Sequence, residues 1–218
     1  MKLIAENLAV DRGDRRVFSD LAFSLESGTA LVVTGANGVG KSSLLRTLAG
    51  LVALKEGVIS LEGGEDDRTA FEHSHYFGHQ DAVKSALTVL ENLTFWQAFT
   101  APISTEVFQT AIHEPAEALE FLGIGHTARL PAAYLSAGQR RRLSLARLMV
   151  SSRPIWLMDE PTSALDRHSE AQLLGLMNAH LDRGGMIVTA THTDLALKSV
   201  RTLHLEAPQD VRIVEELS

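Results

Sequence analysis

The sequence contains no cysteine among its 218 residues. Disulfides, thiolate nucleophiles and cysteine-ligated metal sites are therefore excluded, and the composition fits a reducing compartment. The sequence also lacks an apolar run of the about 20 residues that a membrane-spanning helix needs, because uncharged stretches such as "NLTFWQAFTAPIST" are too short and too polar. We therefore expect any membrane role to come through a partner.

A secretory signal, internal repeats and low-complexity segments are also missing. The N-terminal "MKLIAENLAVDRGD" reaches Glu6 before an apolar signal segment can form, so we expect a cytoplasmic chain. The hydrophobic content of 45% and the charged content of 22% are typical of a soluble globular protein. The net charge of -7 argues against nucleic acid as a partner. The length allows one domain with a sizeable core, with or without a subdomain.

Short apolar runs alternate with turn residues in the first third of the chain. "LIAENLAV", "VFSDLAFSL", "ALVVTGA", "GVISLEG" and "HYFGHQ" indicate strands, and residues 42–51 indicate a helix that ends near Gly50. Residues 87–130 have helical spacing and predict a helical insertion. The chain then returns to a buried strand "PIWLMDE", a helix from Arg167 to about Leu181, a strand "GMIVTATH", and terminal strands around "TLHLE" and "VRIVEE". This order predicts a mainly parallel α/β sheet with an antiparallel lead-in.

The segment "GANGVGKS" has the spacing of a phosphate-binding loop and lies between an apolar strand and a helix. Its glycines let backbone N–H groups turn toward phosphates, Lys41 reaches the β and γ phosphates, and the Ser42 hydroxyl binds Mg²⁺. A glycine-rich strand-to-helix turn without a ligand is the structural alternative. We predict that nucleotide is bound by Gly35, Ala36, Asn37, Gly38, Val39, Gly40, Lys41, Ser42, Ser43 and Arg12.

"IWLMDEP" supplies an acidic pair at the end of a buried strand. Asp159 can reach the Mg²⁺ shell with Ser42, and Glu160 is the candidate to polarise the attacking water. Gln80 and His192 follow other strands and are candidates for contact with the γ-phosphate, with Gln80 also expected at the Mg²⁺. Alone, each of these two would more often be a polar residue at a sheet edge. Ligands of open α/β sheets bind at the carboxyl ends of strands, which favours the functional interpretation.

A second small-residue turn, "LSAGQ", precedes a helix far from the phosphate loop. Together with the loop, Gln80, "IWLMDEP", "SALD" and His192, it resembles the ATP-binding subunits of ATP-binding cassette (ABC) transporters over nearly the whole chain. The resemblance implies a P-loop NTPase fold of the ABC type: one domain, 1–218, with a helical subdomain at about 87–150. It also implies that the signature residues Leu135, Ser136, Ala137, Gly138 and Gln139 complete the ATP site of a second copy, giving a head-to-tail dimer. We expect Ser136 to cap this helix and the backbone N–H groups there to remain unpaired, so that the positive helix end is available to a γ-phosphate from the second copy. A capped helix without a ligand is the alternative.

Three further segments, "GHQ", "LTVLENLTF" and "GGMIVTATHTDL", are similar to segments of the haem-exporter ATPases of cytochrome c maturation, the CcmA type. This resemblance implies an ATP hydrolase on the cytoplasmic face of the bacterial inner membrane. Its partners would be a CcmB-type membrane subunit and CcmC-, CcmD- and CcmE-type proteins. The alternatives are the ATPase of another small bacterial exporter, a soluble non-transport ABC protein, and a catalytically inactive scaffold.

Several residues depart from the family pattern or invite a different function. Arg12 stands where many relatives place an aromatic residue that stacks on adenine, and a guanidinium plane can replace that stacking with looser base selectivity. Ala137 stands where most relatives have glycine, which would cause strain if the position needs positive φ. His73, His75 and His79 share a face if they lie on one strand, and we expect a polar sheet surface there rather than a metal or haem site. We expect Arg140, Arg141 and Arg142 to line a solvated helix face.

Overall fold

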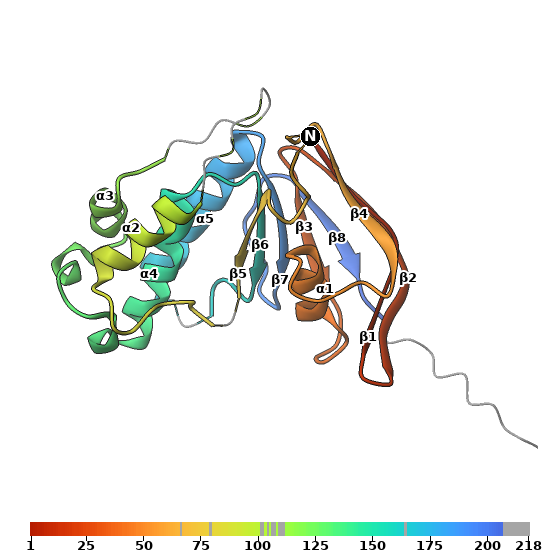
Figure 1. The fold of residues 1–218 in the computed structure, drawn as a ribbon, viewed down its shortest axis with the longest axis horizontal. Helices are drawn as coiled ribbons and strands as arrows, with labels where there is room; N and C mark the ends of the chain where they lie inside the picture. Colours follow the sequence, from red (N-terminus) through yellow and green to blue (C-terminus); the bar gives the residue numbers. More distant parts are fainter. Residues whose placement is uncertain are drawn as a thin grey trace, which may run out of the picture.

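The computed structural model describes residues 1–65, 67–78, 80–100, 103, 105, 108, 112–163 and 165–206. Within these residues the chain forms a parallel sheet with a smaller antiparallel sheet on one side and a group of helices on the other (Figure 1). The predicted terminal strand "VRIVEE" lies outside the described residues.

The antiparallel sheet is formed by β1 (Lys2–Arg12), β2 (Arg15–Glu26) and β4 (Glu56–Glu62), in the order β2-β1-β4. A tight turn at Gly13, which has φ of 59°, joins β1 to β2 and pairs Arg12 with Arg15. The predicted antiparallel lead-in is thereby confirmed.

The parallel sheet has the order β5-β6-β7-β3-β8, and every strand pair in it is parallel. Its strands are β3 (Ala30–Thr34), β5 (Ser74–Phe77), β6 (Ile155–Asp159), β7 (Met186–Ala190) and β8 (Val200–His204). β6, β7 and β3 are neighbours, so their carboxyl ends meet at one edge of the sheet. That edge is where the predicted site residues follow the strands.

The helices differ in how they begin. α1 (Lys41–Leu48) is the next element after β3, and the chain leaves it through Gly50, where φ is 70°. α2 (Val89–Phe99) begins with a capping box between Thr88 and Glu91, and Asp166 caps α5 (Arg167–Asp182). The remaining helices are α3 (Pro115–Phe121), α4 (Ala137–Val150) and the short 3₁₀ turns η1 (Gly125–Thr127) and η2 (Ala132–Tyr134).

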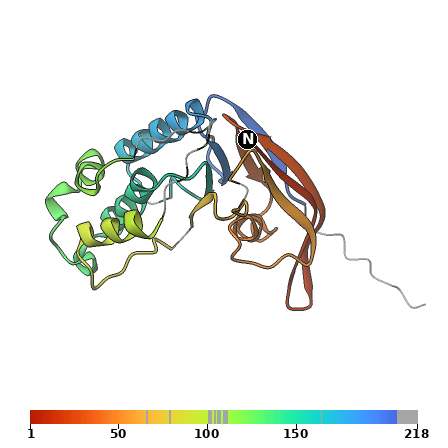
Figure 2. The same cartoon turned by 45° about the horizontal axis from the view of Figure 1, so that its top comes forward.

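Two hydrophobic clusters cover the two faces of the parallel sheet. In β6, Trp156 and Met158 point into the cluster formed with α2, α3, α4 and α5, whereas Ile155 and Leu157 point into the cluster formed with α1 and the antiparallel sheet. All five β6 residues are buried, which explains the uninterrupted apolar run in the sequence. Figure 2 shows the same layering from a second direction, with α5 along the helical side and the antiparallel strands curving around the other.

One predicted strand is shorter in the structure than in the sequence pattern. β5 ends at Phe77, so Gln80 does not lie at the end of a strand but in an exposed bend beyond Gly78. The prediction was wrong here because the parallel ladder with β6 ends at Phe77, and Gly78, which follows it, has no side chain to pack on the sheet.

Candidate active site at the carboxyl ends of β3, β6 and β7

A cavity of about 410 Å³ opens at the edge of the parallel sheet where β3, β6 and β7 end. Most of the predicted nucleotide-binding residues line it, together with the acidic pair and the predicted histidine. The lining residues are Arg12, Asn37, Gly38, Gly40, Lys41, Ser42, Ser43, Asp159, Glu160 and His192. Residues far apart in the sequence are thus brought to one place.

The loop between β3 and α1 depends on two glycines with positive φ. Gly35 has φ of 136°, and a Cβ atom there would lie 2.5 Å from the Leu205 carbonyl oxygen. Gly40 has φ of 118° and precedes α1 without a side-chain cap, and its Cβ would lie 2.6 Å from Val17 Cγ1. Other residues would therefore displace the loop, and the N–H groups at the start of α1 receive no side-chain cap from the chain itself.

Lys41 is a buried cation at the first position of α1, with 8% of its surface exposed. Its Nζ donates to the carbonyl oxygens of Gly35 at 2.8 Å and Ala36 at 3.1 Å. Within the described part of the chain no carboxylate forms an ion pair with it. A buried ammonium group held only by neutral carbonyls favours a bound anion beside it.

Ser42 and Asp159 place two oxygen atoms together on the wall of the cavity. The Ser42 hydroxyl donates to Asp159 Oδ1 over 3.1 Å, and Asp159 is 6% exposed at the end of β6. A hydroxyl and a carboxylate are hard oxygen ligands of the kind that Mg²⁺ prefers. The donor set fits a phosphate-bound Mg²⁺, with the phosphates supplying further ligands.

Glu160 has an unusual backbone conformation, with φ of 46°. Its N–H donates to the Ala190 carbonyl at 2.8 Å, and its carbonyl accepts from Ser163 N–H at 3.1 Å and from Arg141 Nη2 at 2.9 Å. The turn brings Glu160 Oε1 to 3.7 Å from His192 Nε2. The carboxylate and the imidazole, which are 34% and 57% exposed, therefore face the cavity as a pair.

Arg12 lines the cavity at the end of β1, and it also lines a smaller adjoining cavity of about 170 Å³ with Arg15, Val17 and Val39. Arg15 is not among the predicted site residues, and its signal is its pairing with Arg12 across the turn at Gly13. Gln80 is exposed and is absent from the lining of the main cavity. The structure therefore brings Arg12 to the site and leaves Gln80 outside it.

The predicted signature residues surround the start of α4, away from this cavity. Ser136 caps the helix as predicted: its Oγ accepts from Gln139 N–H at 3.2 Å, and Gln139 Oε1 accepts from Ser136 N–H at 2.9 Å. The expectation that the N–H groups of this turn stay unpaired was wrong at Gln139, because the cap itself occupies that donor. Ser136 and Ala137 are exposed, Gly138 has open space around it, and Leu135 is buried as an anchor.

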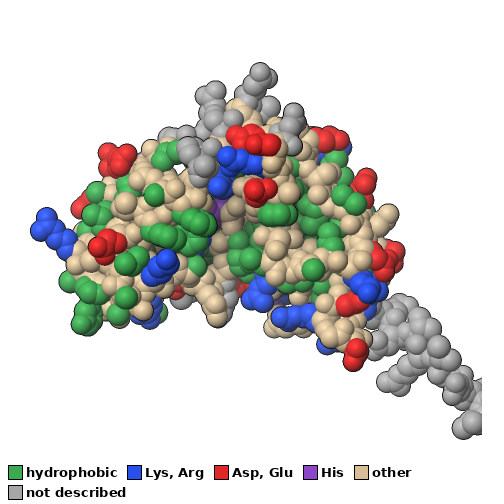
Figure 3. Space-filling view, viewed as in Figure 1, with side chains coloured by type: hydrophobic (Ala, Val, Ile, Leu, Met, Phe, Trp, Pro, Cys, Tyr) green, Lys and Arg blue, Asp and Glu red, His purple; other side chains and the backbone are tan. Residues whose placement is uncertain are grey.

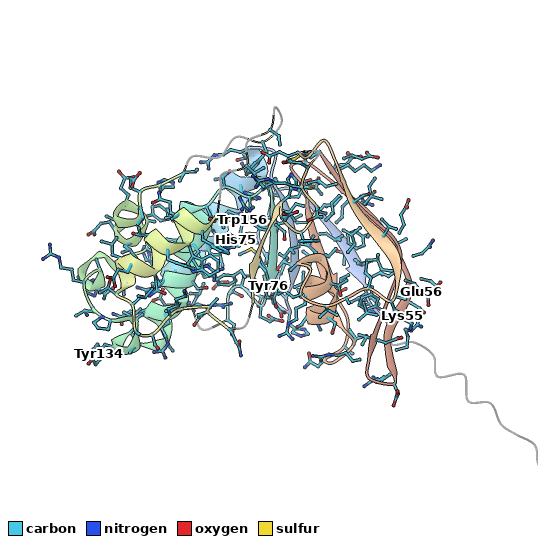
Figure 4. The ribbon with its side chains drawn as sticks, in the orientation of Figure 1. Lys55, Glu56, His75, Tyr76, Tyr134 and Trp156 are labelled. Carbon is cyan, nitrogen blue, oxygen red and sulfur yellow. The ribbon has the colours of Figure 1, made fainter. Side chains whose placement is uncertain are left out.

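Ala137 is the first residue of α4 and is not among the residues with positive φ. The strain anticipated for a missing glycine is therefore absent at this position. Tyr134, just before the signature, lies at the outer edge of the helical half of the molecule and is 77% exposed (Figure 4). The signature faces outward.

The arginine run at the start of α4 does not form a solvated face, because Arg141 is buried at 5% exposure. It contacts Glu160, Gly78 and Asp81, and its burial lowers its pKa against the opposing effect of Asp81. Arg142 pairs with Asp166, and Arg140 donates to the Leu135 carbonyl. No feature of the sequence distinguishes Arg141 from Arg140 and Arg142.

The expected polar sheet surface around the histidines was also wrong. His73 and His75 are buried, and His79 lies outside the described residues. His73 Nε2 accepts from Glu65 N–H, and His75 Nδ1 lies 3.1 Å from Ser151 Oγ. Burial lowers the pKa of His75 well below its ordinary value, with Arg147 adding to the shift. The described residues contain no cluster that could hold a metal ion through histidine, cysteine, aspartate or glutamate.

No helix in the described part of the chain has the length and apolar character needed to cross a membrane. The parallel sheet, the glycine-rich loop into α1 and the acidic pair at the end of β6 define a P-loop nucleotide-binding protein.

Comparison with known proteins agrees with this class. The ABC transporter family profile matches residues 18–163. The chain is 52% identical over 197 residues to the cytochrome c biogenesis ATP-binding export protein CcmA of Nitrobacter winogradskyi, which covers 90% of this chain and 94% of that protein. It is 51% identical over 199 residues to the protein of that name from Mesorhizobium japonicum, covering 91% and 95%.

A solved structure supports the fold. An ABC transporter ATP-binding protein from Pyrococcus furiosus has a TM-score of 0.75 with 21% identity and covers 94% of this chain and 98% of that chain. The chain therefore belongs to the ABC transporter family, in its group of CcmA cytochrome c biogenesis ATP-binding export proteins.

Proposed function

We propose that this chain is the ATP-hydrolysing subunit of a bacterial ABC transporter complex in cytochrome c biogenesis, with haem as the cargo that its membrane partners handle. The observation that carries the proposal is one cavity that combines the buried Lys41, the Ser42–Asp159 pair and the Glu160–His192 pair. The export function in the names of the relatives supports the choice of complex.

The residues of the cavity divide the chemistry between them. Lys41 and the N–H groups of the loop hold the phosphates, since they form a cationic, donor-rich start of α1. Ser42 and Asp159 would hold Mg²⁺, which when bound would neutralise charge on the phosphates. Glu160 accepts a hydrogen bond from the attacking water and orients it, and His192 donates to the γ-phosphate beside it.

The second half of each site comes from another copy of the chain. The start of α4 is exposed and lies outside the cavity of its own chain. The Ser136 hydroxyl accepts from Gln139 and keeps its own proton, which it donates to a γ-phosphate brought by the second copy. The resulting dimer is symmetric and holds two ATP molecules.

The partners of the dimer are membrane proteins. We place the chain at the cytoplasmic face of the bacterial inner membrane, bound to a CcmB-type subunit with CcmC-, CcmD- and CcmE-type proteins. Residues 87–150 act as a helical subdomain that, with Gln80, relays closure of the dimer to them. On the face seen in Figure 3, Lys and Arg side chains lie scattered among acidic ones, and the net charge is -7, which argues against nucleic acid as a partner.

The central test of the enzyme is Glu160→Gln in the purified chain. We expect steady-state phosphate release to fall by about 10² to 10⁴, because the water loses its acceptor, while ATP still binds. Glu117→Gln on α3, an exposed glutamate, is the matched control and keeps wild-type turnover. Unchanged hydrolysis in the Glu160→Gln chain contradicts the assignment.

The partner is tested separately by affinity purification from detergent-solubilised membranes. We expect recovery of a CcmB-type subunit with the chain. Recovery of a lipoprotein-export or cell-division complex in its place contradicts the haem assignment and leaves the ATPase assignment standing.

A further inference from the structure

Arg141 is a buried arginine that lies outside the nucleotide cavity. It is the fifth residue of α4, its side chain is 6% exposed, and its guanidinium carbon lies 3.9 Å from the centre of the Phe77 ring. Such burial is costly for a charged group unless the surroundings satisfy it. The hydrogen bonds of Arg141 therefore indicate what its burial contributes to the structure.

The guanidinium joins three segments that belong to different motifs. Nη1 donates to the Gly78 carbonyl at 2.9 Å and lies 3.3 Å from Asp81 Oδ1, and these two residues stand on either side of Gln80 in the chain. Nη2 donates to the Glu160 carbonyl at 2.9 Å. One planar group thus connects the signature helix, the glutamine segment and the backbone of the acidic residue that orients water.

Glu160 needs such support because its φ of 46° is unfavourable for an L-residue with a side chain. A strained conformation of this kind persists only where the surroundings determine it from several sides. The Glu160 N–H is bound by Ala190 at the end of β7, and its carbonyl by Ser163 and Arg141. Ala190 and Ser163 contribute backbone groups, whereas Arg141 contributes a side chain from helix α4.

We propose that Arg141 is a positioning residue for hydrolysis, which holds Glu160 in its catalytic conformation and makes that conformation depend on the placement of α4 and of the glutamine segment. The inference rests on the proposed ATPase function. Because the guanidinium is rigid and planar, a shift of α4 or of residues 78 and 81 moves the donor away from the Glu160 carbonyl. The Glu160 carboxylate then no longer points at the attacking water, while the phosphates stay bound to the loop.

The alternative is that Arg141 only joins α4 to the sheet. Arg141→Lys separates the two, because lysine keeps the charge but cannot serve both carbonyls with a planar fork. We expect kcat for ATP to fall by about 10 to 100-fold, since small misplacements of a catalytic group have effects of this size, while KM changes by less than about threefold. An unchanged kcat overturns the proposal.

Asp81→Asn is a milder variant, because it leaves Arg141 in the chain and changes only a partner that is 25% exposed. It removes the ion pair between residue 81 and Arg141 and leaves the hydrogen bond from Arg141 to the Glu160 carbonyl. We expect kcat to fall several-fold with KM unchanged, which is less than in Arg141→Lys. If Arg141→Lys fails to fold, this variant decides the matter, and a wild-type kcat overturns the proposal.

Arg147→Lys is the matched control on the same helix. Arg147 is also buried, lies 4.0 Å from the centre of the Trp96 ring, and donates to the Asp81 carbonyl at 3.4 Å, but it does not contact the Glu160 carbonyl. We expect Arg147→Lys to lower the melting temperature while kcat stays within about twofold of wild type. A loss of kcat equal to that of Arg141→Lys assigns both arginines to structure alone and overturns the proposal.

A double-mutant cycle then tests whether Arg141 acts through Glu160. Single-turnover hydrolysis is measured for Glu160→Gln with and without Arg141→Lys. We expect no further loss in the double variant, because the group that Arg141 positions is already disabled. Full additivity overturns the proposal. Wild-type turnover in Glu160→Gln alone is a different outcome, because it overturns the ATPase assignment itself.

Discussion

Helices α1 and α4 are each preceded by a small residue, Gly40 and Ser136, yet they begin in opposite ways. α1 follows Gly40, which has no side chain to cap the helix, and its first residue is the buried Lys41 on the wall of the cavity. α4 begins with a complete capping box between Ser136 and Gln139, in the open and away from the cavity. The two helix starts therefore present the same dipole to different environments.

The difference shows how a chain divides an anion site between two copies. Where one chain binds the phosphate by itself, the N–H groups at the helix start are left free for the ligand. Glycine, which has no side chain, lets the backbone come close to the phosphate. Where the phosphate arrives from another copy, the helix must also be stable alone, and a side-chain cap provides about 1 kcal/mol toward that. The exposed start of α4 thus remains folded in the separate chain.

The largest effect is expected from Lys41→Met, which removes the buried charge at the start of α1. ATP affinity of the separate chain should fall by about 10² to 10³, because a buried charged contact is worth several kcal/mol. Equilibrium binding of a fluorescent ATP analogue measures it. An affinity within a few-fold of wild type contradicts the role of Lys41 and erases the contrast between the two helix starts.

Ser136→Ala is the corresponding change at α4. The separate chain should bind ATP as the wild type does, while turnover falls roughly 10-fold because the γ-phosphate loses a charge-assisted hydrogen bond. Thr88→Ala is the control, because Thr88 and Glu91 form the same capping box at α2 away from the site. Both variants should lose about 1 kcal/mol of stability. Equal turnover in the two contradicts a catalytic role for the α4 cap.

The α4 side of the sheet should also govern the pH dependence of stability, because it buries His75 and His180. His180 stacks on Trp156 at 3.9 Å and donates to the Pro154 carbonyl, and burial lowers its pKa to about 3 (Figure 4 shows Trp156 and His75 near the helices). An unfolded histidine has a pKa of about 6.5, so between these values only the unfolded chain binds the proton. Stability is fully present above about pH 6.5 and is lost as the pH falls.

The expected slope is about 1.4 kcal/mol per pH unit below pH 6.5 for each such histidine. His180→Phe keeps a flat ring against Trp156 and removes the titrating group. Urea unfolding at pH 7.0, 6.0 and 5.5 should therefore show a shallower loss of stability in the variant. The same slope in both chains would mean that His180 titrates normally.

The smallest effect is expected from Ala137→Gly. Ala137 has helical backbone geometry, so glycine relieves no strain there. Turnover and ATP affinity should stay within about twofold of wild type, and stability should fall by up to about 1 kcal/mol because glycine is the poorer helix former. A several-fold gain in turnover contradicts this and indicates that the methyl group obstructs the phosphate of the second copy.

The sequence allowed the α1 half of this comparison to be predicted almost completely. A phosphate loop is specified by local chemistry, because the residues from Gly35 to Ser42 must turn and donate within one strand–helix junction. Asp159 and Glu160 followed from an apolar run that ends in acids, and His192 from the end of the next strand. The parallel sheet then brings these strand ends together.

The α4 half could be predicted only in its local part. The capping box of Ser136 and Gln139 follows from residue spacing, whereas the burial of Arg141 depends on how α4 packs against Phe77 and Glu160. Residue alternation placed His73 and His75 on one face but gave no information on what covers that face. The strand that was expected to lead to Gln80 also depends on a neighbour that the sequence does not show. Its ladder with β6 ends at Phe77.

The central claim is that the start of α1 in one copy meets the start of α4 in another, and mixing two inactive chains tests it most directly. Lys41→Met destroys the first half-site, and Ser136→Glu repels phosphate from the second. An equimolar mixture should regain about a quarter of wild-type hydrolysis per chain, because half of the dimers are mixed and each of these holds one intact site of two. A mixture as inactive as its components contradicts the claim.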